Sequence, residues 1–405
     1  MGIDFELTPE QRSLRDWVRG FVEKSIKPRV FEIEENPEAS DEILREASKI
    51  GLLALPIPQE YGGGGVSSIE TNIALEEIAV GDGGIATAIG ASWFGMTPIL
   101  IAGNREQMDR FLPPLASKDE VNLCCMAMTE EQGGSDIEDH RMGGRTIRTK
   151  VREEGEYYVI TGRKMWPSNF DIATFYTTVA TFDPTGEEGT CVIVVERWRE
   201  GLSFGQPEYK MGMHGDRNGE IIYDDVKVPK ENLLGGKGLG LKILTRTITY
   251  NRGGAGAISV GMARGAMERV LEYSKQRIVG GKPLIKHELV QAIFADMAIE
   301  LDAARLLVWR AAWFNSQPGR RSLRWATMAK VYASDVAERI TSRCVQLMGS
   351  YGYSRKSGVE KYMRDNKIIQ IYLGANELCR QIIGELLEET GPFEPIHPID
   401  RVKVR

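Results

Sequence analysis

The chain has 405 residues, of which 42% are hydrophobic and 27% charged, and its formal net charge is −6. This length suits two or three packed subdomains, and a negative balance without a long Lys/Arg block argues against a nucleic-acid surface. The five cysteines and four histidines show no metal-ligand or disulfide spacing, so we expect no metal site and a reducing, cytoplasmic location. We identify neither a signal peptide nor an apolar stretch of about 20 residues, and we therefore expect no membrane span.

Residues 1–120 are predicted to form a helical domain. The sequence Thr8-Pro9-Glu10-Gln11 is a capping box with proline at the first helical position. Apolar residues then follow at helical spacing: Leu14, Trp17, Val18, Phe21 and Val22. We interpret glycines 62–65 as a loop, because no Lys-Ser or Lys-Thr pair follows them to make a phosphate cradle.

Residues 121–235 are predicted to form a β domain. Short runs rich in Val, Ile, Thr and Tyr alternate here with Gly and Pro, and Glu154-Gly155 separates two of them as a hairpin turn does. Because no helical segment lies between the runs, we expect an antiparallel sheet or small barrel rather than a parallel sheet.

Residues 236–390 return to helical periodicity, whereas residues 391–405 are predicted to be an irregular tail. Two apolar stripes indicate long helices that pack in a bundle. The first stripe is Leu289, Ile293, Met297, Leu301, Ala304 and Val308, and the second is Trp325, Met328, Tyr332, Val336 and Ile340.

Three segments carry residues suited to ligand binding, and each also has a purely structural interpretation. Residues 124–136 leave a strand for a glycine-rich turn, which can hold an anionic or carbonyl-rich ligand or can be ordinary turn chemistry. Trp166 and Ser168 follow a strand and suit a flat aromatic ligand, unless Trp166 simply covers the core. Gln346 and Gly349 lie where a helix ends or where the backbone approaches a cofactor closely.

Six motifs in order resemble those of the acyl-CoA dehydrogenase family, across nearly the whole chain. MTEEQGGSD (128–136) is similar to the family's M-T-E-P-G-A-G-S-D, KMWPSN (164–169) to K-x-W-I-T-N, and IIQIYLGANELCRQII (368–383) to I-Y-Q-I-Y-E-G-T-N-E-I-Q-R. The other three are residues 223–235, 295–313 and 346–353. The resemblance implies an α+β fold with an N-terminal helical domain, a middle antiparallel β domain and a C-terminal four-helix bundle. It also implies that the protein binds FAD and an acyl-CoA thioester.

The resemblance also implies roles for individual residues. The FAD-binding positions are Met126, Met128, Thr129, Ser135, Trp166, Ser168, Arg277, Gln291, Gln346, Gly349, Ala375 and Glu377. Trp166 and Ser168 are expected beside the reactive N5 edge of the flavin, and Arg277 at the FAD diphosphate of a neighbouring subunit. This implies a homo-oligomer, usually a tetramer in the family, and an electron-transfer flavoprotein as the electron acceptor. The substrate-binding positions are Ser135, Asn251, Arg252, Leu373 and Gly374. Trp93 and Phe94 either line the acyl tunnel or pack in the core.

Both positions at which the family carries its proton-abstracting glutamate hold other residues here, namely Leu373 and Asn251. A positioned base typically contributes about 10²–10⁴-fold in rate, so its loss demands an explanation. In one interpretation the enzyme still oxidises an acyl-CoA, but the base lies elsewhere and the acyl group is cyclic or already unsaturated. In a second, it performs a non-oxidative elimination such as desulfination. In a third, it is a non-catalytic acyl-CoA-binding subunit of a hetero-oligomer. We favour the first, and the nearly complete FAD motifs argue against the third.

The candidates for a relocated base are Asp216 and His214, which are less usual at their positions, and Tyr250, which stands beside Asn251. Asp82 and Glu77 are also acidic, but we expect them to cap or solvate helices. The sequence leaves the choice among the three candidates open.

Overall fold

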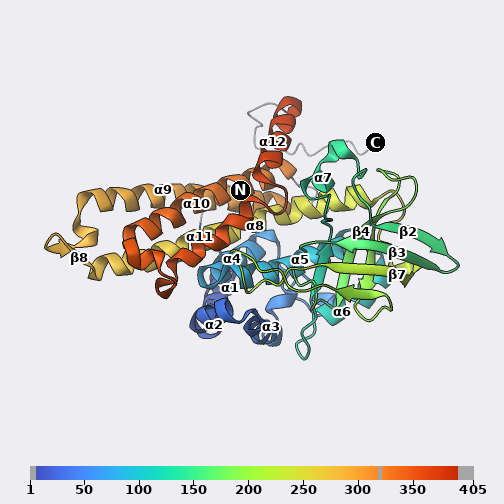
Figure 1. Ribbon diagram of the computed structural model, residues 1–405, viewed down its shortest axis with the longest axis horizontal. Coiled ribbons are helices and arrows are strands. Elements are labelled where there is room, and N and C mark those ends of the chain that lie inside the picture. Colours follow the sequence, from blue (N-terminus) through green and yellow to red (C-terminus); the bar gives the residue numbers. More distant parts are fainter. Residues whose placement is uncertain (1–5, 318–321, 391–405) are drawn as a thin grey trace.

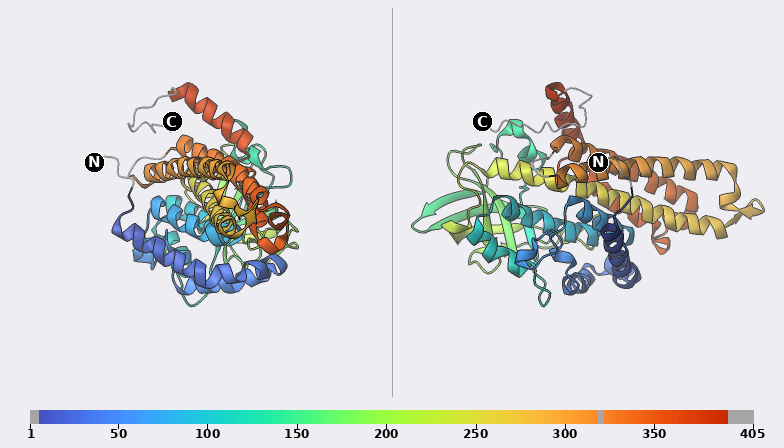
Figure 2. Two further views of the ribbon diagram at one scale, coloured as in Figure 1. Left: turned by 90° about the vertical axis from the view of Figure 1, so that its left-hand side faces the viewer. Right: turned by 180° about the vertical axis from the view of Figure 1, so that it is seen from behind.

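The computed structural model describes residues 6–317 and 322–390, and the predicted tail 391–405 lies outside them. A helical part, a β-sheet part and a second helical part follow one another along the chain (Figure 1). The sheet lies at one end of the molecule, and long C-terminal helices extend to the other (Figures 1 and 2).

The first part is helical, as predicted. Its helices are α1 (Pro9–Phe21), α2 (Val30–Glu35), α3 (Ser40–Lys49), α4 (Ser68–Gly81), α5 (Gly83–Ala102) and α6 (Arg105–Leu115). The capping box at α1 is confirmed, since the Gln11 N–H donates to Thr8 Oγ1 at 3.2 Å and the Thr8 N–H donates to Gln11 Oε1 at 3.0 Å. Gly62–Gly65 form a loop before α4, also as predicted.

Helix α5 corrects the expectation that the sequence has no apolar stretch of membrane-spanning length. Its 20 residues carry no charge and are apolar enough to cross a membrane by length and composition. Of its most apolar window, 67% is buried inside the protein, where α5 packs between α4, α8 and β1. The helix is therefore a core helix. Small residues such as Gly90, Ser92 and Gly95 made the stretch look like several shorter ones.

The middle part is a seven-stranded sheet with the strand order β1-β4-β2-β3-β7-β6, to which β5 adds by pairing with β4. The strands are β1 (Cys124–Ala127), β2 (Lys150–Glu154), β3 (Tyr157–Lys164), β4 (Phe175–Thr181), β5 (Thr190–Glu196), β6 (Leu202–Phe204) and β7 (Ile221–Pro229). The β2–β3 hairpin turns at Gly155, whose φ is 57°, so that prediction is confirmed. The expectation of a wholly antiparallel sheet is wrong at β4, which pairs in parallel with β1 and, at Lys150–Thr181, with β2. The β2–β3 hairpin lies between β1 and β4 in the chain and lets it return in the same direction.

The third part is a helical bundle. It contains α8 (Gly240–Gln276), a small hairpin of β8 (Ile278–Val279) and β9 (Lys282–Pro283), α9 (Glu288–Ser316), α10 (Leu323–Tyr353), α11 (Val359–Lys367) and α12 (Asn376–Thr390). The predicted stripes are largely buried, but Leu289 is 75% and Tyr332 40% exposed. Leu289 lies in the first turn of α9, next to the β8–β9 hairpin end of the bundle. At Gly349 the backbone of α10 leaves helical geometry, with φ 60° and ψ −141°, so the regular helix stops there, as one interpretation had it, and a second helical stretch continues beyond the kink to Tyr353.

Candidate active site

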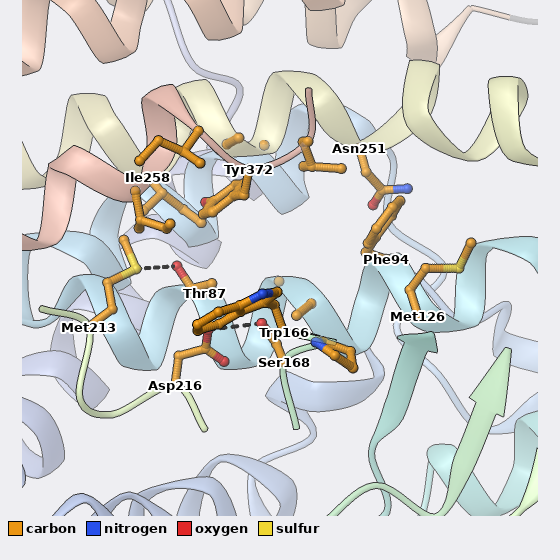
Figure 3. Close-up of a pocket in the computed structure, with 18 of the residues that line it drawn as sticks. Thr87, Phe94, Met126, Trp166, Ser168, Met213, Asp216, Asn251, Ile258 and Tyr372 are labelled. Atoms are coloured by element: carbon orange, nitrogen blue, oxygen red, sulfur yellow. Dashed lines mark hydrogen bonds between the residues drawn. The ribbon is translucent and has the colours of Figure 1, made fainter. Parts of the chain in front are cut away.

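A cavity of about 600 Å³ lies where the three parts of the fold meet. Its walls come from α4, α5 and α8, the turn between β1 and α7 (Ser135–Glu138), the segment after β3, the loop before β7 and the turn before α12. Figure 3 shows the space between Trp166 and Ser168 on one side and Tyr372 and Asn251 on the other. A cavity of this size can hold a drug-sized ligand.

The glycine-rich turn after β1 forms one wall. Met126, Met128, Thr129 and Ser135 all line the cavity, so the structure brings together the four residues that the resemblance placed around the flavin ring. Lys164, which is fully buried, fixes this turn: its Nζ donates to the Met128 carbonyl at 3.0 Å and to Glu130 Oε1 at 2.8 Å.

The segment after β3 presents Trp166 and Ser168 to the cavity. Trp166 has a left-handed backbone conformation, with φ 68°. Its N–H donates to the Gly219 carbonyl at 3.0 Å, and its carbonyl accepts from Asn218 Nδ2 at 2.9 Å, which together hold this conformation. The indole does not cover the core, since Trp166 is 51% exposed.

Asp216 lies on the same side of the cavity as Ser168 (Figure 3). The Ser168 hydroxyl donates to Asp216 Oδ2 at 2.8 Å, whereas Oδ1 is buried and has no hydrogen-bond partner among the described residues. The nearby Lys210 Nζ donates to the backbone carbonyls of Met213 and Asp216 and to Asn218 Oδ1, and not to the carboxylate. Burial raises the pKa of Asp216 above its ordinary value.

The loop that carries Asp216 is anchored from behind by a buried polar cluster. The Met213 N–H donates to Asp365 Oδ1 at 2.6 Å, and Asp365 in turn pairs with Lys361. His214 points into this cluster: its Nδ1 lies 3.3 Å from Glu34 Oε1, and its Nε2 lies 3.1 Å from the Lys210 carbonyl. His214 is not among the cavity-lining residues that the structure describes. Of the three predicted base candidates, Asp216 and Tyr250 therefore line the cavity, whereas His214 lies in the polar cluster behind the loop.

Of the other two acids, Asp82 caps a helix as expected, whereas Glu77 neither caps nor solvates one, because it is buried in ion pairs. Asp82 caps α5, accepting from the Ile85 N–H at 2.8 Å, and pairs with Lys361 at 2.9 Å. Glu77 pairs with Arg264 and Arg19. Neither belongs to the described lining of the cavity.

Leu373 lies in the turn before α12 and lines the cavity together with Gly374 and Ala375. Leu373 has φ 48° and Gly374 φ 81°, and a left-handed conformation is unfavourable for leucine. Three side chains hold the turn: Arg252 Nε donates to the Leu373 carbonyl at 3.0 Å and Lys330 Nζ to the Gly374 carbonyl at 2.7 Å, while Ser135 Oγ accepts from the Ala375 N–H at 3.1 Å. Burial lowers the pKa of Lys330 to about 8.

Asn251 and Arg252 differ in position although they are adjacent. Asn251 lines the cavity, and its Nδ2 donates to Thr97 Oγ1 at 3.0 Å and to the Thr247 carbonyl at 2.9 Å. Arg252 is buried beside the cavity and is not among its described lining residues. Within the protein its guanidinium serves the Leu373 turn.

Glu138 is a cavity residue that the sequence analysis missed. It stands three positions after Ser135, at the end of α7, and its Oε2 accepts from Arg252 Nη2 at 2.7 Å. Both side chains of this pair are buried, with 1% and 3% exposure. A Cβ at Gly374 would lie 3.0 Å from Glu138 Oε2 and 2.8 Å from Arg252 Nη2, so the pair packs directly against the turn. The sequence feature that could have identified Glu138 is its position in the segment MTEEQGGSDIE, two residues after a motif that resembles the family's.

Four other predicted FAD-binding positions lie far from the cavity, namely Arg277, Gln291, Gln346 and Gly349. Arg277 ends α8, and Gln291 lies in the first turns of α9. The end of α10, with Gln346 and Gly349, lies beside them, since Tyr351 stacks on Tyr273 of α8 with the ring centroids 5.9 Å apart. Arg277 is about 28 Å along the helix axis beyond Ile258, a cavity residue of the same helix. Glu377 is exposed in the first turn of α12.

The two aromatic residues of α5 both line the cavity and also pack in the protein. Trp93 Nε1 donates to the Leu53 carbonyl at 2.9 Å. Phe94 stands near Asn251 and Met126 in the close-up (Figure 3).

These features define a three-part enzyme with a ligand cavity between a β domain and a helical bundle. Models of the acyl-CoA dehydrogenase N-terminal, middle and C-terminal domains match residues 8–119, 125–226 and 238–387. The chain belongs to the acyl-CoA dehydrogenase family. It is therefore an FAD-dependent flavoprotein and an oxidoreductase that acts on CH–CH bonds of acyl-CoA thioesters. This confirms the family, the fold class, the enzyme class and the cofactor that were predicted from the sequence.

Named relatives agree with this assignment. Cyclohex-1-ene-1-carbonyl-CoA dehydrogenase of Syntrophus aciditrophicus is 36% identical over 94% of this chain and 91% of its own length. The structure of butyryl-CoA dehydrogenase from Megasphaera elsdenii superposes with a TM-score of 0.90 at 33% identity, covering 95% of this chain and 100% of the other. An acyl-CoA dehydrogenase complexed with FAD, from Bacillus anthracis, has a TM-score of 0.87 at 29% identity, covering 95% of this chain and 68% of the other.

Proposed function

We propose that the enzyme oxidises a cyclic or already unsaturated acyl-CoA thioester, with Asp216 as the residue that accepts the substrate proton. The observation that carries this proposal is the Asp216 carboxylate itself, which lines the cavity beside Ser168 and leaves Oδ1 without a hydrogen-bond partner among the described residues. At the two usual base positions Leu373 and Asn251 line the same cavity and offer no acid.

The choice of Asp216 follows from a comparison of the carboxylates. Two acidic residues, Asp216 and Glu138, belong to the described lining of the cavity. The Glu138 carboxylate is already occupied, because it pairs with the Arg252 guanidinium at 2.7 Å. Asp216 has no ion-pair partner among the described residues, and its raised pKa brings its basicity closer to the neutral range in which a general base works best. The anchored loop behind it supports a fixed position.

The position of Asp216 bears on the substrate. Asp216 lies with Ser168 and Trp166, across the cavity from Tyr372, which precedes the usual base position (Figure 3). A base on this wall reaches a different carbon from a base at residue 373. In a cyclic or unsaturated acyl group, conjugation can make such a carbon acidic although it is not next to the thioester carbonyl. The name of the Syntrophus relative, a cyclohexene-carbonyl-CoA dehydrogenase, supports a substrate of this class.

The residues around the cavity fit a flavin ring. Trp166, Met211 and Ile371 line the cavity and are 51%, 59% and 54% exposed, so a flat ring placed against them would cover apolar surface that water now meets. Met126, Met128, Thr129, Ser135, Ser168 and Ala375 are the residues that we propose hold it. When bound, FAD supplies the two-electron acceptor for the oxidation.

Arg277, Gln291, Gln346 and Gly349 support a homo-oligomer. They lie too far along the bundle to reach the cavity of their own subunit, so a role in FAD binding requires the FAD of a second copy. Helix α9 also carries large exposed apolar residues at heptad-related spacing, namely Leu289, Ile299, Leu306 and Trp313, and such a stripe suits a subunit interface. We further propose that an electron-transfer flavoprotein accepts the electrons from the reduced flavin. We also propose a cytoplasmic location, because the five free cysteines fit a reducing compartment.

The test is an anaerobic titration of the FAD-loaded protein with straight-chain, branched, cyclic saturated and cyclic unsaturated acyl-CoA thioesters, followed by flavin absorbance. We expect at least one cyclic or unsaturated thioester to bleach the flavin much faster than straight-chain thioesters do. Equal or faster reduction by simple straight-chain thioesters would overturn the proposed substrate class. If a thioester is consumed by elimination while the flavin stays oxidised, the oxidative assignment for that substrate is wrong.

A further inference from the structure

A polar side chain of α4 faces the cavity and has no hydrogen-bond partner in the part of the chain that the structure describes. Asn72 is 5% exposed and lines the cavity together with Thr71 and Leu75 of the same helix. No hydrogen bond within the described residues uses its amide group. A primary amide offers two donors and an acceptor, and a nearly buried polar side chain is normally hydrogen-bonded. This amide therefore lacks its partner.

Two glycines of α8 make room for the amide. A Cβ at Gly253 would lie 3.5 Å from Asn72 Nδ2, and a Cβ at Gly254 would lie 3.6 Å from Asn72 Oδ1. Gly254 itself lines the cavity, as do the apolar side chains of Leu75 and Ile258. Asn72 thus places a hydrogen-bonding group in a largely apolar part of the cavity, where a purely hydrocarbon ligand would leave it unpaired.

The charges around the cavity restrict the kind of partner. The described lining residues of α4, α5 and α8 include no charged side chain. The cationic lining residues, Lys210, Arg364 and Lys367, come from the loop before β7 and from α11. Because burying a carboxylate or an ammonium without a counter-ion is costly, the partner of Asn72 is expected to be neutral.

We propose that Asn72 binds a neutral oxygen substituent, a hydroxyl or oxo group, on the acyl chain or ring. This rests on the proposed function only in that the acyl group occupies this cavity. The amide can donate to an oxo oxygen, or donate to and accept from a hydroxyl. The hydroxyl of the neighbouring Thr71 already donates to the Ser68 carbonyl at 3.1 Å, so Asn72 is the residue that supplies the donors for such a substituent. The enzyme is therefore selective for an oxygenated acyl group over its hydrocarbon analogue.

Calorimetric titration of the FAD-loaded enzyme tests this assignment. The probes are cyclohexane-carbonyl-CoA and its hydroxy and oxo derivatives substituted at each ring carbon, measured without an electron acceptor. We expect at least one derivative to bind about tenfold or more tightly than the unsubstituted thioester, because a site built for a hydrogen bond rejects ligands that leave it unpaired. In Asn72→Leu, which has a similar volume, this preference is expected to disappear, whereas the control Thr71→Val should retain it.

The outcomes separate this inference from the proposed function. If no derivative binds better than the unsubstituted thioester, or if Asn72→Leu keeps the preference, the inference is wrong, whatever the flavin does. If the preference is present but no thioester reduces the flavin, the inference holds and the proposed oxidation fails. Asn72→Ser serves in place of Asn72→Leu if the latter does not fold, and it should show a weaker preference than the unmodified enzyme.

Discussion

Removal of the Glu138 carboxylate is the perturbation whose size the structure defines best. In Glu138→Ala, Arg252 stays almost fully buried and loses its only ion-pair partner among the described residues. It keeps hydrogen bonds to the Leu373 carbonyl and to Thr327 Oγ1. Removing one member of a buried pair typically costs about 3–5 kcal/mol, because the remaining charge is left buried and uncompensated. We therefore expect a loss of stability of about this size.

The assay is urea unfolding of the FAD-loaded protein at one fixed concentration of protein and flavin, because FAD binding stabilises the folded state by mass action. Glu138→Gln keeps an acceptor for Arg252 and should lose less. The matched control is Glu385→Ala, which removes the 3.0 Å pair with Arg141, whose side chains are 46% and 35% exposed. Such a pair is worth about 0–1 kcal/mol. If Glu138→Ala is no less stable than Glu385→Ala, the Glu138 carboxylate does not compensate the buried charge of Arg252, and the reasoning is refuted.

Three further predictions concern the chemistry. Leu373→Glu should let a saturated straight-chain acyl-CoA reduce the flavin about tenfold or more faster than before, since it returns a carboxylate to the usual base position; stopped-flow absorbance measures this, and no gain would mean that the shape of the cavity has diverged as well. Burial raises the pKa of Asp216 above its ordinary value, and the residue must be ionised to accept a proton, so the reduction rate should fall as the pH falls through that raised pKa. A rate that falls only at or below about pH 4, the ordinary range of an aspartate, or the same pH dependence in Asp216→Asn, would contradict the assignment. Arg277→Ala should lower the FAD content after gel filtration, while thioester affinity of reconstituted protein stays the same, and an unchanged FAD content would exclude its role at a neighbour's cofactor.

Local patterns allowed much of the fold to be predicted. The Thr8 capping box and the Gly155 hairpin turn depend on residues within a few positions of one another, so the sequence displays them directly. The parallel pairing of β1 with β4 depends on where the chain returns after the β2–β3 hairpin, which local composition does not record. Helix α5 was not recognised as one apolar helix, because its small residues interrupt the hydrophobic pattern.

In the site, too, residues within contiguous motifs could be predicted, whereas contacts between residues far apart in the sequence could not. The flavin-side residues were found because they lie in contiguous motifs. Asp216 was named as a candidate, but its contact with Ser168 spans 48 positions, and only the structure separates it from His214. Glu138 was missed because its meaning comes from Arg252, 114 positions away. Asn72 was missed for a related reason: its role is visible only from the absence of a partner.

The most direct test of the relocated base is a comparison of Asp216→Asn with Glu138→Gln in anaerobic single-turnover reduction. Both variants are FAD-loaded and are mixed with the thioester that reduces the unmodified enzyme fastest. We predict that Asp216→Asn slows flavin reduction by about 10²–10⁴-fold with an unchanged dissociation constant for the thioester. Glu138→Gln should slow it far less. A rate for Asp216→Asn within a few-fold of the unmodified enzyme, or a larger loss in Glu138→Gln, would contradict the account.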